Sequence, residues 1–132
     1  MIFIDTNYLL RFLLKDIDSQ YLEAKKLLLQ AARGEKKVIT STIVFFELFW
    51  VLKSYYKKDK AELISTLKKI LDLNFIQLKE RAILKDSIEY FGKTSLDLED
   101  CYNLAFAKTH KIEELKTFDE KLITEWTKET QN

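Results

Sequence analysis

Short apolar segments alternate in this chain with longer segments of helical periodicity, and this alternation restricts the fold more than any other feature. Apolar segments of strand length lie at residues 1–5, 36–41, 74–78 and 115–118, and at least one expected helix follows each of them. The first segment is expected to form a short buried strand. Neighbouring parallel strands need a crossover connection, which is normally a helix. The alternation therefore predicts an α/β fold with a short, mainly parallel sheet.

The expected helices follow from the spacing of the apolar residues and from residues that start or end a helix. Ser19 is a candidate N-cap, and Gly34 and Gly92 follow helical patterns at positions where a left-handed residue often ends a helix. The expected helices span residues 6–14, 19–33, 42–56, 60–71, 80–91, 98–110 and the segment from 119 onward.

The composition fits one packed domain over residues 1–132. Hydrophobic residues make up 47% of the chain, and no segment rich in proline, glycine or serine marks a linker. No apolar segment is long enough to span a membrane and no leader peptide is recognisable, so a cytoplasmic protein is expected. The net charge of +1 argues against a protein that holds nucleic acid by bulk positive charge alone.

A single cysteine excludes a disulfide-stabilised domain and a cysteine-rich zinc site. The single histidine, His110, makes a histidine-based triad or a multi-histidine metal site hard to build. Any chemistry must therefore rest on carboxylates. Asp5 follows the first expected strand, and Asp119 follows the fourth. Ligands of parallel α/β sheets bind beyond the carboxyl ends of the strands, so these two acids are expected at one edge of the sheet.

Glu47 and Asp100 are candidates on helices. Glu47 is the only charged residue in the apolar segment STIVFFELFWVL. A carboxylate on such a helix either takes part in a site or lies at the edge of the core, where it reaches water or a distant lysine. Asp100 is the third residue of a helix that Asp97 can cap, so it either completes a capping box or binds a ligand at the helix N-terminus.

Four such carboxylates would suit a hard divalent cation. Mg²⁺ and Mn²⁺ bind oxygen ligands and retain several waters. An ion held in this way lowers the pKa of a bound water and stabilises charge on a phosphoryl group, as phosphodiester hydrolysis requires. Such chemistry needs neither histidine nor cysteine.

The chain resembles the PIN-domain family, and its length resembles the VapC-type toxins of that family. The family pattern has an aspartate, a threonine or serine, and an asparagine or serine at the end of the first strand. It continues with a serine six residues before a helical glutamate, Asp-Ala at the start of a late helix, and Thr-Phe-Asp. It is matched in order by the segments IDTNYLL, STIVFFELFWVL and SLDLEDCYNLAFAKTHKIEELKTFD. The resemblance implies a three-layer α/β/α sandwich and Mg²⁺- or Mn²⁺-dependent ribonuclease activity. It also implies homodimers and inhibition by a small antitoxin protein.

The resemblance assigns roles by position in these motifs. It implies that metal binding and catalysis are carried out by Asp5, Glu47, Asp100 and Asp119. It also implies that those carboxylates are oriented by Thr6, Asn7, Ser41 and Thr117. The sequence departs from the family where Cys101 replaces a small alanine, and because it ends soon after the terminal helix, the last edge strand of the family could be missing.

Two alternatives stay open beside a toxin-type endoribonuclease. The chain could be a non-catalytic binding module with a PIN-like fold and structural acids. It could also be a phosphatase that uses Asp5 as a nucleophile, resembling haloacid dehalogenases, although those carry a second aspartate where this chain has Asn7. Arg11 and Lys15 follow Asp5 along the chain and are candidates for contacts with an RNA backbone.

Overall fold

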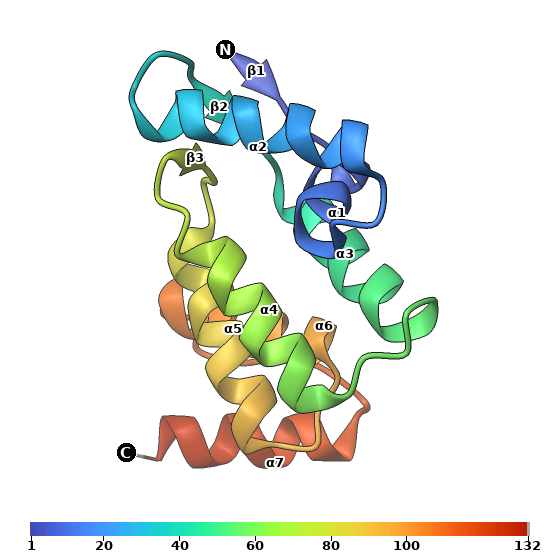
Figure 1. The fold of residues 1–132 in the computed structure, drawn as a ribbon. Coiled ribbons are helices and arrows are strands. Elements are labelled where there is room, and N and C mark those ends of the chain that lie inside the picture. Colours follow the sequence, from blue (N-terminus) through green and yellow to red (C-terminus); the bar gives the residue numbers. More distant parts are fainter. Residues whose placement is uncertain (132) are drawn as a thin grey trace. The chain divides into compact units, whose positions relative to one another are not determined.

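The computed structural model describes residues 1–131, and the chain divides into two compact units, Met1–Glu80 and Arg81–Asn132 (Figure 1). The first unit holds the strands β1 (Ile2–Phe3), β2 (Val38–Ile39) and β3 (Ile76–Gln77), and the helices α1 (Thr6–Leu14), α2 (Asp18–Ala32), α3 (Thr42–Ser54) and α4 (Lys60–Leu71). The second unit holds the helices α5 (Arg81–Lys93), α6 (Leu98–Thr109) and α7 (Glu120–Thr130).

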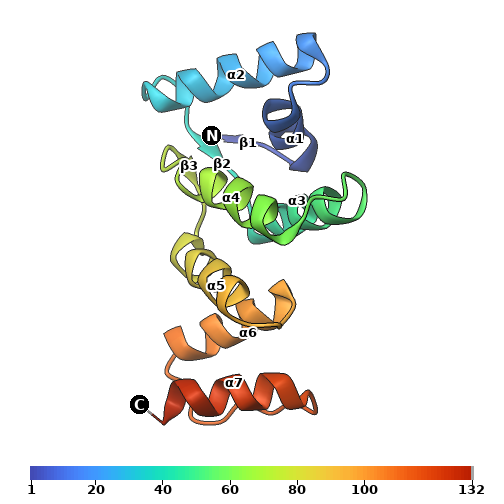
Figure 2. The ribbon, with the colours of Figure 1, turned by 60° about the horizontal axis from the view of Figure 1, so that its bottom comes forward.

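The strands of the first unit form a three-stranded parallel sheet in the order β1-β2-β3. Ile2 is paired with Val38, and Val38 is paired in turn with Ile76. Figure 2 shows α2 on one side of these strands and α4 on the other, so the first unit is layered helix, sheet, helix. The predicted α/β fold with a short parallel sheet is confirmed.

The core of the first unit lies where α1 and α4 meet the apolar helix α3. α1 packs against α2 and α3, and α3 packs against α4. The hydroxyl of Thr40, just after β2, donates a 2.8 Å hydrogen bond to the carbonyl oxygen of Ile4, so the ends of β1 and β2 are tied together. The largest fully buried side chains of these helices belong to Leu9, Phe45, Leu48, Phe49, Leu52, Leu67 and Leu71.

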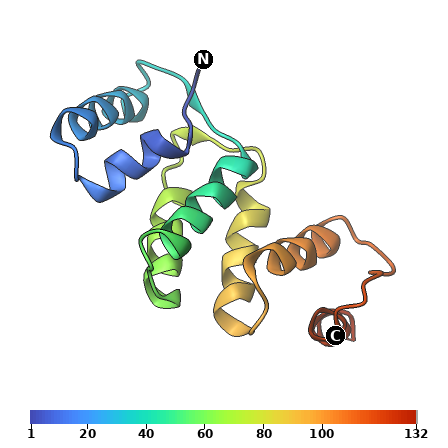
Figure 3. The same ribbon diagram turned by 90° about the vertical axis from the view of Figure 1, so that its right-hand side faces the viewer.

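The second unit is a small helical assembly in which α6 packs against both α5 and α7 (Figure 3). Leu98, Cys101 and Leu104 of α6 are fully buried, as the apolar spacing of that helix requires. The C-terminal helix is held by Glu129, whose carboxylate accepts hydrogen bonds from Lys108 Nζ at 2.7 Å and from the Tyr90 hydroxyl at 3.2 Å.

The predicted helices are confirmed to within about two residues at each end, but two of the predicted end signals are wrong. Gly34 has a φ of +77° just after α2 and ends that helix as expected. Gly92 does not end α5, which continues to Lys93. Ser19 is not an N-cap either, because α2 begins at Asp18 after Ile17, which makes no side-chain cap.

Two predictions about strands are also wrong. Residues 115–118 form an irregular segment, because a strand requires a hydrogen-bonded neighbour and the described part of the second unit contains no other strand. The first strand is not buried: Phe3 is 58% exposed, since β1 is an edge strand, and only Ile4 after it is buried. Among residues 1–131, no strand follows α7 and no helix is long and apolar enough to cross a membrane.

Candidate active site

Asp5 lies at the exit of β1 and caps α1. The chain leaves the strand through the buried Ile4, and Asp5 then adopts an extended conformation with an exposed side chain. Its Oδ1 accepts a 3.2 Å hydrogen bond from the backbone N–H of Tyr8, which satisfies one of the free donors in the first turn of α1. The cap uses one carboxylate oxygen, and Oδ2 remains available to a ligand.

Glu47 meets Thr6, the residue next to Asp5, across the interface between α1 and α3. The hydroxyl of Thr6, which is buried, donates a 2.7 Å hydrogen bond to Glu47 Oε2. The sequence placed Glu47 on a helix that is apolar almost all round, yet its side chain is exposed. Glu47 therefore lies at the edge of the core, where its carboxylate reaches water and is open to a ligand.

Asp100 lies in the first turn of α6, where the side chain of Asp97 is the N-cap. Asp97 Oδ1 accepts a 2.9 Å hydrogen bond from the backbone N–H of Asp100, so the predicted cap is confirmed. Partial burial raises the pKa of Asp100 above its ordinary value of 3.8, and the negative charges of Asp97 and Asp119 raise it further. Asp100 and Asp119 are therefore electrostatic neighbours within the second unit.

Asp119 caps α7 in the same way that Asp5 caps α1. Its Oδ1 accepts a 2.9 Å hydrogen bond from the backbone N–H of Leu122, and its side chain is exposed. The hydroxyl oxygen of Thr117 accepts a 3.0 Å hydrogen bond from the backbone N–H of Asp119. Thr117 thus holds the backbone of Asp119, whereas the sequence assigned it to the carboxylate.

The other two residues expected to orient carboxylates behave differently. Ser41 is the N-cap of α3, where its Oγ accepts a 3.3 Å hydrogen bond from the backbone N–H of Val44. Asn7 is exposed and lies beside Asp5 in the wall of a pocket. Thr6 is the one member of this predicted group with a hydrogen bond to a candidate carboxylate among the described residues.

The two candidates for RNA contacts both have partners inside the first unit. Arg11 Nη1 donates hydrogen bonds of 2.9 and 2.7 Å to the two carboxylate oxygens of Asp16. Lys15 ends α1 in a left-handed conformation, with φ of 54°, and its Nζ lies 5.5 Å from the centre of the Tyr21 ring. Contact with RNA therefore stays a prediction for both residues.

The donor chemistry of the candidate acids fits a hard divalent ion, because all of them offer carboxylate oxygens and Asp100 experiences the repulsion of Asp97, Asp119 and Glu99. Within residues 1–131, no group of three or more histidine, cysteine, aspartate or glutamate side chains is close enough together to hold an ion. Asp5 and the Thr6-bound Glu47 belong to the first unit, and Asp100 and Asp119 belong to the second.

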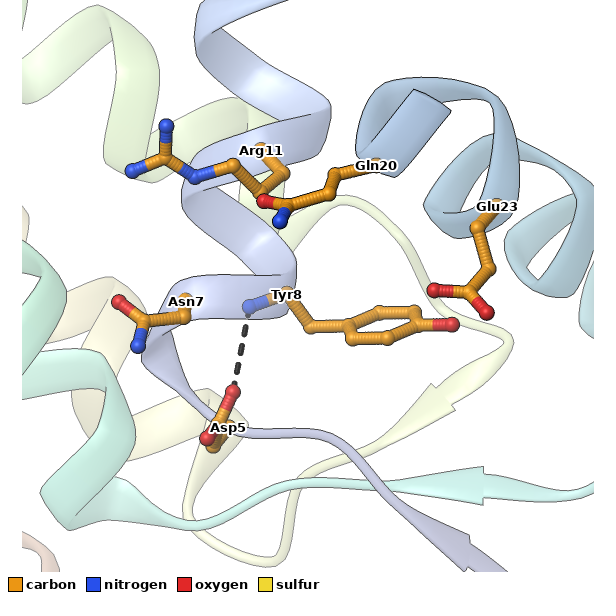
Figure 4. Close-up of a pocket in the computed structure, with 6 residues that line it drawn as sticks. All are labelled: Asp5, Asn7, Tyr8, Arg11, Gln20 and Glu23. Carbon is orange, nitrogen blue, oxygen red and sulfur yellow. Dashed lines mark hydrogen bonds between the residues drawn. The ribbon is translucent and has the colours of Figure 1, made fainter. Parts of the chain in front are cut away.

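Pockets beside the acids reveal residues that the sequence reasoning missed. In the first unit, a pocket beside Asp5 is lined by Tyr8, Gln20 and Glu23 as well (Figure 4). In the second unit, a pocket of about 290 Å³ is lined by Asp100 together with Asn103, Glu114 and Lys116. Helical spacing could have indicated Tyr8, three residues after Asp5, and Asn103, three residues after Asp100, because such residues share one helix face.

Comparison with known proteins completes the description of these acids. A family model described as the PIN domain matches residues 2–124, which include Asp5, Glu47, Asp100 and Asp119. Neither a search of curated proteins nor a search of solved structures finds a match. Since the matched segment covers most of the 132 residues, this chain belongs to the PIN domain family.

Proposed function

We propose that this chain is a metal-dependent endoribonuclease that hydrolyses RNA phosphodiester bonds. PIN domains are typically nucleases that use divalent metals, and RNA is the substrate that the family suggests. The observation that carries the proposal is the extent of the family match, because it includes every candidate carboxylate: Asp5, Glu47, Asp100 and Asp119.

In this proposal, capping and ligand binding are performed by the same side chains. Asp5 and Asp119 each use Oδ1 for a helix N-terminus, which restricts their rotamers and leaves Oδ2 for a cation. Thr6 fixes one oxygen of Glu47 in the same way. Ligands held by such neighbours lose less conformational freedom when an ion binds.

The raised pKa of Asp100 supports the same role. A cation near Asp100 and Asp119 would offset the partial burial and the neighbouring negative charges that raise the pKa of Asp100. A bound Mg²⁺ or Mn²⁺ would supply an activated water and stabilise charge on the phosphoryl oxygens. The chain would supply the carboxylates that hold the ion.

The proposal gives the acids of each unit a role in metal binding, and the two units can be tested separately. Asp5→Asn removes a charge from the first unit, and Asp100→Asn removes one from the second. We expect each change to abolish cleavage of a structured RNA with Mg²⁺ or Mn²⁺ and to weaken Mn²⁺ binding in a calorimetric titration. Asp18→Asn, an exposed aspartate in the first turn of α2, is the matched control and should retain both.

Three outcomes would contradict the proposal. One is the absence of cleavage by the wild type with any divalent metal. Another is equal cleavage by the wild type and the Asp5→Asn variant. The third is RNA binding without cleavage and without dependence on metal, which would identify a non-catalytic binding module.

We further propose that the chain is the toxin of a toxin–antitoxin pair and forms a homodimer. The aromatic residues of α3 support a partner surface: Phe45 and Phe49 are buried in the core, whereas Trp50 is 47% exposed and Tyr55, just after the helix, is 76% exposed. Expression of the wild type should arrest growth, and the Asp5→Asn variant should not. Light scattering should give the mass of two chains, and a monomeric mass would contradict the proposed homodimer.

A further inference from the structure

A pocket between α1 and α2 adjoins Asp5 and has a chemistry that metal binding does not use. It has a volume of about 230 Å³. Asp5, Tyr8 and Arg11 follow one another at intervals of three residues along α1, and Gln20 and Glu23 face them from α2 with the same spacing. Figure 4 shows Tyr8 extending from α1 toward the carboxylate of Glu23, with Gln20 between Arg11 and the Tyr8 ring.

The polar groups of this pocket have hydrogen-bonding capacity that the chain itself does not use. Burial raises the pKa of Tyr8, and the adjacent Glu23 carboxylate raises it further, so the Tyr8 hydroxyl stays protonated at neutral pH. That hydroxyl can occupy one acceptor position of Glu23, and a carboxylate has about four. The side-chain amide of Gln20 makes no hydrogen bond to another described residue.

We propose that this pocket binds an RNA base next to the cleavage site and prefers guanine. The proposal rests on the proposed ribonuclease function, because it places the base beside Asp5, a proposed metal ligand. RNA-binding proteins commonly take an unstacked base against an aromatic ring and read its Watson–Crick edge with hydrogen bonds. Tyr8 supplies the ring, and Glu23 and Gln20 supply the polar groups.

The preference for guanine follows from the hydrogen-bonding chemistry of Glu23. An ionised carboxylate only accepts hydrogen bonds. Guanine presents two adjacent donors, N1–H and the N2 amino group, on its Watson–Crick edge, whereas each other RNA base presents one donor group there. Guanine alone can therefore donate to both oxygens of Glu23, while the amide of Gln20 can donate to O6.

Arg11 adds little net positive charge to this pocket. Its guanidinium already donates two hydrogen bonds to the carboxylate of Asp16, so that acid balances its positive charge. Asp5 and Glu23 add negative charge to the same pocket. Non-specific attraction of phosphate is therefore weak here, and discrimination between bases depends on hydrogen bonds.

Nucleotide binding without metal tests the pocket separately from catalysis. GMP, AMP, CMP and UMP would each be titrated, in the presence of EDTA, into the isotopically labelled full chain, and the backbone amide signals of Tyr8, Gln20 and Glu23 would be followed by NMR. We expect GMP to bind most tightly, with a preference of roughly 5- to 150-fold, as a bidentate contact gives. Glu23→Gln should remove the preference, because an amide offers only one acceptor oxygen.

Glu35→Gln is the matched control, because it removes the same charge from an exposed position after α2. It should keep the preference for GMP. Equal binding of the four nucleotides, no shift of the pocket signals with any of them, or loss of preference in both variants would overturn the proposal. Thermal unfolding of Glu23→Gln, an exposed position on α2, checks that the variant is folded.

Cleavage then distinguishes failure of the pocket from failure of the proposed function. A set of RNAs that differ in one base beside the cleaved bond should be cut fastest with guanine by the wild type. Cleavage by the wild type without any base preference would overturn the pocket alone. If the chain prefers GMP but cleaves no RNA, the proposed base-binding pocket would be supported and the proposed ribonuclease function would be contradicted.

Discussion

The hydroxyl of Thr6 donates a 2.7 Å hydrogen bond to Glu47 Oε2, across 41 residues of sequence. The bond joins the first residue of α1 to the middle of α3, so the segment after β1 and the apolar helix are held in one arrangement. It also places a candidate carboxylate against the residue that follows Asp5. A single contact thus connects the packing of the first unit with its proposed chemistry.

Replacing Thr6 with valine keeps the shape of the side chain and removes its hydrogen bond. We expect Thr6→Val to lower the free energy of unfolding by about 0.5–1.5 kcal/mol, because the exposed Glu47 can be solvated instead. Mn²⁺ affinity should fall about 10- to 100-fold through loss of the oriented carboxylate. Thr6→Ser should retain both, and urea unfolding with a Mn²⁺ titration measures them. A normal Mn²⁺ affinity in Thr6→Val would contradict the orienting role.

The cap and the proposed ligand role of Asp119 can be separated by choosing the substitution. Asparagine caps helices about as well as aspartate, whereas alanine costs about 1 kcal/mol at an N-cap. Asp119→Asn should therefore leave the free energy of unfolding almost unchanged and weaken metal binding. Asp119→Ala should lose stability as well, because the Leu122 N–H loses its acceptor. Equal Mn²⁺ binding by the wild type and Asp119→Asn would show that Asp119 is only a cap.

Asp100 should make the stability of the metal-free chain fall as the pH rises. Partial burial and the charges of Asp97 and Asp119 raise its pKa above 3.8 in the folded state, so the folded chain binds this proton more tightly than the unfolded chain does. The resulting stabilisation is present below the ordinary pKa and is lost as the pH rises through the raised value.

Urea unfolding across this pH interval in EDTA measures the effect. Asp100→Asn does not titrate there and should lack this component of the pH dependence. Asp97→Asn keeps a capping side chain and removes one of the charges, so it should shift the component toward lower pH. Identical pH profiles for the wild type and Asp100→Asn would contradict the raised pKa.

Glu129 should contribute stability with the opposite dependence on pH. The hydrogen bond from Lys108 is the main cause of its lowered pKa, so its contribution is present above the ordinary value of 4.5 and is lost as the pH falls below it. Because the Lys108 side chain is 55% exposed, we expect Glu129→Gln to cost less than about 1 kcal/mol at neutral pH. Glu125→Gln, whose carboxylate lies 3.5 Å from Lys128, is the control and should cost less still. An equal loss in the two variants would contradict a specific role for Glu129.

Much of the local structure could be predicted from the sequence because helices depend on nearby residues. The helical hydrogen bond spans four residues, so apolar spacing and caps such as Asp97 and Gly34 are readable in short segments. The capping roles of Asp5 and Asp119 are local in the same way, since each residue directly precedes a helical pattern. The segment 115–118 was predicted wrongly because a strand depends on a partner elsewhere in the chain.

The sequence by itself determined the order of the helices and of the first three strands, and it placed Asp5 at a strand exit and Glu47 and Asp100 on helices. Those properties follow from local periodicity and from motifs. Asp119 was expected after a strand, but it follows an irregular segment. Only the tertiary structure decided that Thr6 binds Glu47, that Glu47 is exposed, and that neighbouring charges raise the pKa of Asp100. Burial and charge at one residue depend on segments that are distant along the chain, and packing alone brings those segments together.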